Sequence, residues 1–308
     1  MFELLNGTLR DTPADITSVE LIGSTPATSL SGISVIHDGY MYLIPGRNRS
    51  GVAQRVLYRM ELTTSKIDTL AVPPSPAFTA VALHHEGYIY ISGGTPITGS
   101  DAPSTNFTRY HIETNTWETL PSMPVARSKH AIAVYGGKIY VAGGLGVTTV
   151  HVYNPVSRTW SAFDTSGVSH PYAQLLFVQL GKYVYMLGGY QAGAVPVNKG
   201  SRLDLETGEW VDYTSQFGFV NAMRLGDLFH YRNLFYAIPG QYNNVVSSKI
   251  FRITLGGLKG VVEEIGTTPT VRFGACYAMD KNVIYAYGGS PTGTSSSGTG
   301  DIYKFTLG

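Results

Sequence analysis

The chain has little of what marks extracellular, membrane or nucleic-acid-binding proteins. Its 308 residues include a single cysteine, Cys276, so no disulfide can form within the chain and burial must supply its stability. Charged residues make up only 14% of the sequence, and the net charge of +1 gives no electrostatic reason to bind DNA or RNA. We therefore expect no nucleic-acid partner.

Targeting and membrane segments are missing from the sequence as well. The first eight residues, MFELLNGT, have neither the basic region nor the apolar core of a signal peptide. No apolar run approaches the roughly 18 residues that cross a bilayer. We therefore expect a soluble chain without a signal peptide, made in the cytoplasm and not inserted into a membrane.

Motifs of the common catalytic sites are absent. The chain has no P-loop, no His-Glu-x-x-His, no Gly-x-Ser-x-Gly and no cluster of cysteine and histidine. His84 and His85 are neighbours in a strand-like segment, so their side chains point to opposite faces and do not share one ion. The sequence predicts no metal, no cofactor and no catalytic residue.

What the sequence does contain is one repeat used six times. Each copy is a short apolar run that ends on Gly-Gly or Pro-Gly, and a tyrosine recurs within it at positions 42, 90, 140, 185, 236 and 285. The six copies are Gly39–Gly46, Gly87–Gly94, Gly137–Gly144, Lys182–Gly189, Asn233–Gly240 and Asn282–Gly289. A period near 50 residues is typical of a propeller or a repeat array.

The third repeat shows the unit most clearly. It divides into four strand-length pieces separated by turn residues: 127–135, 138–142, 148–153 and 159–163. The second piece is apolar on both faces, so each four-stranded sheet must be covered on both sides. Neighbouring blades of a ring provide that cover.

An apolar strand ending in Gly-Gly, a tyrosine about nine residues later and a tryptophan seven residues after that resembles the kelch repeat. Gly143, Gly144, Tyr153 and Trp160 show the pattern best. The resemblance implies an all-β, six-bladed kelch-type propeller with four antiparallel strands in each blade. We expect one domain over 1–308, with blades at about 24–70, 71–120, 121–163, 164–213, 214–266 and 267–308.

The two ends of the chain indicate how the ring closes. The sixth repeat stops at its third strand, 301–307, so its outer strand must come from elsewhere. We assign that strand to about 16–22, which would complete the last blade and satisfy its open edge.

Functional residues are expected on the face that carries the long loops between second and third strands. These loops are 47–55, 95–106, 190–200, 241–248 and 290–300, and we call their side of the ring the long-loop face. Arginines on this face suit a carboxylate or an acidic partner, and aromatic rings and amides suit proteins or sugars. Three further candidates, Arg127, His130 and Arg272, begin first strands near the central channel. The candidate binding residues are Arg47, Arg49, Arg55, Asp101, Arg127, His130, Tyr190, Gln191, Gln241, Tyr242, Asn243 and Arg272.

Three functions remain open. The leading prediction is a non-catalytic recognition or scaffold subunit that binds a protein partner or a surface glycan through the long-loop face. Many kelch proteins add a BTB, F-box or coiled-coil segment, and none is expected here. Low charge and the abundance of Gly, Ser, Thr and Tyr also suit a virion component, such as a phage decoration, collar or adsorption protein bound to other virion proteins. Six-bladed sialic acid mutarotases of the kelch type are the enzymatic alternative, with Arg127 and Arg272 at the channel. The oligomeric state is left open.

Overall fold

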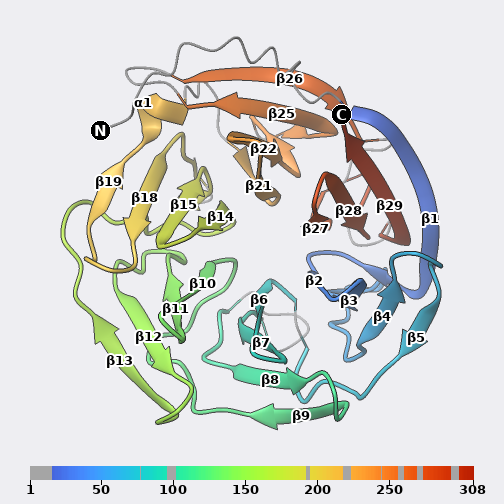
Figure 1. The fold of residues 1–308 in the computed structure, drawn as a ribbon, viewed down its shortest axis with the longest axis horizontal. Helices are drawn as coiled ribbons and strands as arrows, with labels where there is room; N and C mark the ends of the chain where they lie inside the picture. Colours follow the sequence, from blue (N-terminus) through green and yellow to red (C-terminus); the bar gives the residue numbers. More distant parts are fainter. Residues whose placement is uncertain are drawn as a thin grey trace.

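The structure is a computed structural model that describes residues 16–76, 78–95, 102–191, 195–217, 223–243, 245–255, 260–268, 273–292 and 298–308. Within these residues, six four-stranded antiparallel sheets stand around a common axis (Figure 1). The predicted class, an all-β propeller of four-stranded blades, is confirmed.

Each blade runs from an inner strand at the axis to an outer strand at the rim. The first three are β2 (Ile33–His37), β3 (Tyr40–Ile44), β4 (Tyr58–Glu61) and β5 (Ile67–Thr69); β6 (Ala80–His85), β7 (Tyr88–Gly93), β8 (Phe107–His111) and β9 (Thr116–Thr119); β10 (Ala131–Tyr135), β11 (Lys138–Ala142), β12 (Val150–Asn154) and β13 (Thr159–Phe163). The other three are β14 (Leu176–Leu180), β15 (Tyr183–Leu187), β18 (Gly200–Asp204) and β19 (Trp210–Asp212); β21 (Asp227–Tyr231), β22 (Leu234–Ile238), β25 (Lys249–Thr254) and β26 (Val261–Thr267); β27 (Cys276–Asp280), β28 (Val283–Tyr287), β29 (Thr299–Leu307) and β1 (Ile16–Ser29).

The sixth sheet combines both ends of the described chain. β1 lies antiparallel to β29, with Val19 opposite Phe305 and Leu21 opposite Tyr303 (Figure 1). β1 extends to Ser29, seven residues beyond the predicted strand 16–22, and three register shifts interrupt the pairing. Such bulges bend a strand, so the longer β1 curves along the rim and leads into the first blade.

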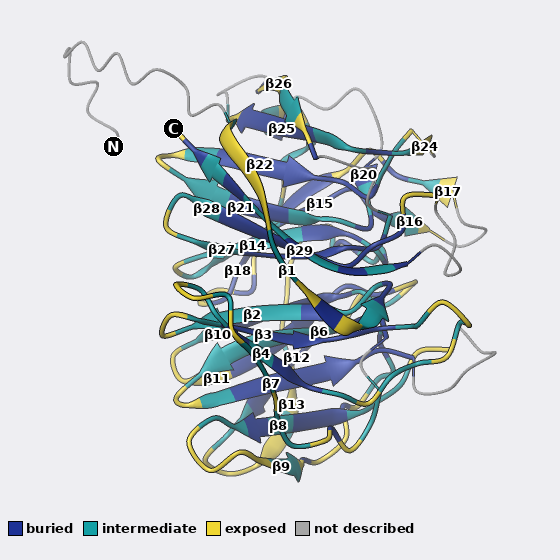
Figure 2. Ribbon diagram, turned by 90° about the vertical axis from the view of Figure 1, so that its right-hand side faces the viewer, coloured by how far each residue is buried: buried dark blue, intermediate teal, exposed yellow. Residues whose placement is uncertain are grey.

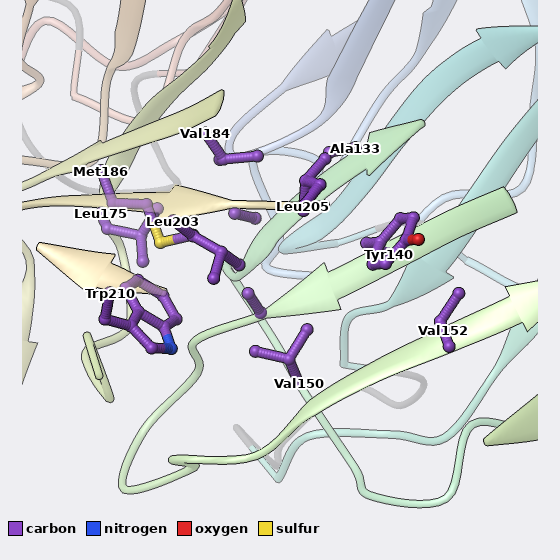
Figure 3. Close-up of a cluster of buried hydrophobic side chains, with 12 residues drawn as sticks. Ala133, Tyr140, Val150, Val152, Leu175, Val184, Met186, Leu203, Leu205 and Trp210 are labelled. Atoms are coloured by element: carbon purple, nitrogen blue, oxygen red, sulfur yellow. The ribbon is translucent and has the colours of Figure 1, made fainter. Parts of the chain in front are cut away.

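The recurring aromatic residues pack in the core between blades. Five of the six repeated tyrosines are buried, and Tyr185 is half-buried. The seven-residue spacing places Tyr110 opposite Trp117 and Tyr153 opposite Trp160 on third and fourth strands. Figure 3 shows the buried cluster between the third and fourth blades, to which Trp210 and Tyr140 contribute.

The glycine pairs let one blade approach the next. Gly93 has φ of +66°, and a Cβ there would lie 2.3 Å from the carbonyl oxygen of Arg127. A Cβ on Gly188 would likewise lie 2.0 Å from the carbonyl oxygen of Met223. No larger residue fits these contacts, which explains why the strand ends on glycine.

Short elements extend the long-loop face beyond the blades. The hairpin β16 (Tyr190–Gln191) and β17 (Val195–Pro196), and the sheet of β20 (Met223–Arg224), β23 (Gln241–Tyr242) and β24 (Val245–Val246), project on the right in Figure 2. A single turn of helix, α1 (Thr214–Phe217), buries Phe217 beside the fourth blade. In the part of the chain that the structure describes, no helix is long and apolar enough to cross a membrane.

Candidate binding face and central channel

A ring of backbone groups surrounds the channel on the long-loop face. Just before each inner strand, one or two positions ahead of its first residue, lies a residue with a left-handed backbone and a φ between 49° and 65°. These residues are Ser31, Thr79, Lys129, Gln174, Leu225 and Gly274. We call them the mouth ring. Five N–H···O=C bonds of 2.6 to 3.0 Å join them in order around the channel, beginning with the Ser31 N–H donating to the Gly274 carbonyl. The mouth is therefore built by backbone hydrogen bonds.

A cavity of about 130 Å³ lies just inside the mouth ring. Its walls include the apolar side chains of Ile33, Leu175 and Phe177. The titratable residues that line it are Lys129, His130, Asp227, Cys276 and Tyr277. The cavity is thus a mixed surface in which a few polar groups lie among apolar ones.

Asp227 contributes the carboxylate of this cavity. Its Oδ2 accepts the backbone N–H of Tyr277 at 3.0 Å, which joins the inner strands of the fifth and sixth blades. Asp227 is half-buried in the channel wall, and desolvation by the surrounding protein raises the pKa of its carboxyl to about 7, although the Tyr277 N–H acts in the opposite direction. Asp227 was not among the predicted site residues, because no local motif distinguishes it. Only the repeat alignment, which places it on an inner strand, could have drawn attention to it.

Two buried polar atoms beside the cavity, His130 Nδ1 and Gln174 Oε1, have no hydrogen-bond partner among the described residues. The other ring nitrogen of His130 lies 2.8 Å from Ser92 Oγ. Burial, with Arg127 nearby, holds the pKa of His130 well below its usual range, so this imidazole is neutral. The predicted place of His130 at the channel agrees with the structure, and its role there stays a prediction.

Arg127 does not face the channel as we expected. Its side chain is 1% exposed, and its guanidinium donates to the carbonyls of Gly143 and Thr149 and lies 3.0 Å from His151 Nδ1. Burial lowers its pKa to about 10. Arg127 starts beside Gly94, and its long side chain reaches across to carbonyls of the loop 143–149 and satisfies them.

The three arginines of the first long loop do not converge on one anion site. The guanidinium of Arg47 lies 3.8 Å from the ring centroid of Phe78. Arg49 Nε donates to the carbonyl of Gly298 at 2.9 Å, and Arg55 Nε donates to that of Pro73 at 2.8 Å. Each arginine turns to a different neighbouring carbonyl or ring, and the role of these three residues in binding stays a prediction.

The fourth and fifth blades do bring predicted residues together. Arg224 Nε donates to Gln241 Oε1 at 2.6 Å, and its guanidinium lies 5.8 Å from the ring centroid of Tyr190. The Tyr242 ring lies 4.9 Å from that of Phe251. The sequence reasoning missed Arg224, since the connection that carries it has no recurring motif.

The remaining predicted residues are exposed or lie outside the described part of the chain. Gln191 and Asn243 are exposed on the two hairpins of the long-loop face. Asp101 and Arg272 lie outside the described residues.

Comparison with known proteins identifies the repeat. A family model described as the KLHDC2/KLHL20/DRC7 Kelch-repeats domain matches residues 33–227. The F-box/kelch-repeat protein At4g39580 of Arabidopsis thaliana is 33% identical over 132 residues, which cover 39% of this chain and 34% of that protein. Kelch domain-containing protein 10 of Homo sapiens is 22% identical over 233 residues, 70% of this chain and 53% of that protein. The matches thus span about a third to a half of these relatives.

A solved structure, that of the protein YjhT, shares the whole fold. It aligns with a TM-score of 0.72, and the alignment covers 92% of this chain and 98% of YjhT. At 16% identity this likeness concerns the fold alone. The family model, by contrast, matches more than half of the sequence, and it covers the repeats whose glycine, tyrosine and tryptophan spacing the structure explains. The chain therefore belongs to the kelch-repeat family.

Proposed function

We propose that this kelch propeller is a non-catalytic recognition module that docks a protein partner on its long-loop face. We treat 1–308 as one propeller domain for this purpose. The observation that carries the proposal is the meeting of exposed apolar and cationic side chains on that one face. Val195 is 48% exposed and Val245 is 68% exposed, each on a hairpin that projects from the ring (Figure 2).

The two hairpins supply a prearranged surface. Arg224 links the tyrosine of one hairpin with the glutamine of the other, through the contacts to Tyr190 and Gln241 described above. Aromatic and arginine side chains held in place by their neighbours are typical of the central part of protein interfaces. Less side-chain entropy is then lost when a partner binds.

Charge on the neighbouring blades indicates the chemistry of the partner. The connections 45–57, 70–79 and 120–130 contain five cationic residues and no aspartate or glutamate. The turns at the other end of the first two blades contain acidic residues, among them Asp38 and Glu86. Arg127 is buried, but Arg49 and Arg55 are exposed and keep nitrogen donors for carboxylates. We infer a partner that presents acidic side chains next to apolar ones.

The test is a quantitative pull-down from extract of the natural source, with wild type and surface variants as bait. Val195→Asp combined with Val245→Asp removes the apolar contacts, and Arg49→Glu combined with Arg55→Glu reverses the charge. Val156→Asp is the matched control, since Val156 is 93% exposed in a turn at the opposite end of the blades. We expect a stoichiometric protein that wild type and the control retain and that both face variants lose. If the control loses it equally, or if wild type retains no protein, docking on this face is wrong.

The other two candidate functions gain no support from a specific contact. The virion alternative rests on composition. The mutarotase alternative required arginines at the channel, whereas Arg127 is engaged between blades and Arg272 lies outside the described residues.

A further inference from the structure

The central cavity contains a carboxylate that no described cation neutralises. Asp227 makes its hydrogen bond to a backbone N–H, and no ion pair joins it to a lysine or arginine among the described residues. Lys129 is the one lysine or arginine in the described lining, and its ammonium lies near the Phe78 ring, 5.8 Å from the centroid. A half-buried carboxylate is costlier to ionise than one in water until it meets a cation.

The other titratable groups of the lining do not supply that cation. His130 is neutral because burial lowers its pKa, and burial raises the pKa of the Cys276 thiol, which stays protonated. Tyr277 contributes its backbone N–H to Asp227. Above neutral pH Asp227 is therefore the anionic group of the described lining, and Lys129, whose ammonium lies near the Phe78 ring, is the cation of that lining.

The unpartnered atoms are mainly acceptors. Gln174 Oε1 accepts only. In the tautomer in which His130 Nε2 donates to Ser92, the buried Nδ1 also accepts. An ammonium group carries three donors and one positive charge, which matches this set of acceptors and the carboxylate.

Size limits the rest of the ligand. The volume of about 130 Å³ is below the roughly 300 Å³ at which pockets for drug-sized ligands begin. A cavity of about 150 Å³ holds benzene, so the ligand has about six non-hydrogen atoms or fewer. The apolar walls formed by Ile33, Leu175 and Phe177 suit a short carbon chain.

We propose that the cavity inside the mouth ring binds a small primary amine in its ammonium form, which pairs with Asp227 and donates to Gln174. The site is separate from the protein-docking surface, because none of the hairpin residues lines the cavity. Failure of one proposal therefore leaves the other standing.

The experiment compares ethanolamine with ethylene glycol by calorimetry. The two molecules have equal numbers of non-hydrogen atoms, and ethylene glycol replaces the ammonium by a hydroxyl. Measurements at about pH 8 keep Asp227 ionised, since its pKa is about 7, and keep the amine protonated. We expect wild type to bind ethanolamine at least about tenfold more tightly than ethylene glycol, as expected for a charged hydrogen bond.

Variants then assign the preference to one carboxyl. Asp227→Asn keeps an oxygen for the Tyr277 N–H and should abolish the preference for ethanolamine. Asp164→Asn removes an exposed acid of the long-loop face and should leave the preference for ethanolamine unchanged. If Asp227→Asn does not fold, Gln174→Ala takes its place and should weaken ethanolamine binding several-fold. Equal binding of both ligands by wild type, no binding of ethanolamine, or an unchanged preference in the folded variant would each overturn the proposal.

Discussion

The side-chain amide of Gln179 pairs with the backbone of Val134 in the neighbouring blade. The Val134 N–H donates to Gln179 Oε1 at 3.0 Å, and Gln179 Nε2 donates to the Val134 carbonyl at 2.6 Å. Because β10 is the inner edge of its sheet, these backbone groups have no strand partner of their own. Asp227 and the Tyr277 N–H form a similar bridge between two other blades. Side chains thus join the inner strands of neighbouring blades along the wall of the channel.

Replacing Gln179 by Leu should lower the free energy of unfolding by about 1–3 kcal/mol, because a backbone donor and an acceptor lose their partner. Urea denaturation measures the change. Gln191→Leu, at an exposed position on a hairpin, is the control and should change stability by less than about 0.5 kcal/mol. Equal effects of the two substitutions would show that the bridge contributes nothing.

Arg127→Ala should destabilise the protein by about 3 kcal/mol or more, because two carbonyls and His151 lose a charged donor in a buried site. Arg127→Lys should recover only part of this loss, since an ammonium cannot reproduce the fork of the guanidinium. Arg55→Ala, an exposed arginine, serves as control in the same urea titration. A fully stable Arg127→Ala variant would contradict the structural role.

Asp227 should make the protein less stable as pH rises. Its pKa is raised from 3.8 to about 7 in the folded state, so between these values the folded protein binds more protons than the unfolded chain. Relative to that of Asp227→Asn, the free energy of unfolding of wild type should therefore fall by up to about 4 kcal/mol between these two pH values. Water in the channel reduces this loss. Thermal unfolding of both proteins across this range measures the difference, and a constant difference would show that Asp227 does not titrate there.

His170 should act in the opposite direction. Burial lowers its pKa from 6.5 to about 4, and both ring nitrogens lie within hydrogen-bond distance, of Ser201 Oγ at 2.9 Å and the Gly188 carbonyl oxygen at 3.0 Å. The contribution of His170 to the free energy of unfolding is up to about 3 kcal/mol. It is complete above pH 6.5 and is lost as pH falls to about 4.

The His170→Gln variant isolates this contribution, since glutamine offers a donor and an acceptor but does not titrate. The free energy of unfolding of wild type should fall relative to that of the variant as the solution is acidified through this window. A parallel decline of the two proteins would mean that the acid sensitivity arises elsewhere.

Sequence reasoning identified the repeat and its packing. A local pattern is repeated in register, so the spacing of Tyr153 and Trp160 was enough to place them on facing strands, and the glycine pairs were enough to end the second strands. It also identified the long-loop face, because loop length follows from the strand assignments. The position of β1 beside β29 followed from counting strands.

The chemistry of the site was decided only by the tertiary structure. Arg127 and Arg47 lie in loops, where side-chain direction depends on which carbonyl or ring a neighbouring blade presents, and no local pattern carries that information. Asp227 is one carboxylate among many in the sequence, and it gains its raised pKa only when six inner strands enclose it in the channel. The sequence by itself determined the propeller because its repeat is local, whereas the channel site depends on contacts between residues far apart in the chain.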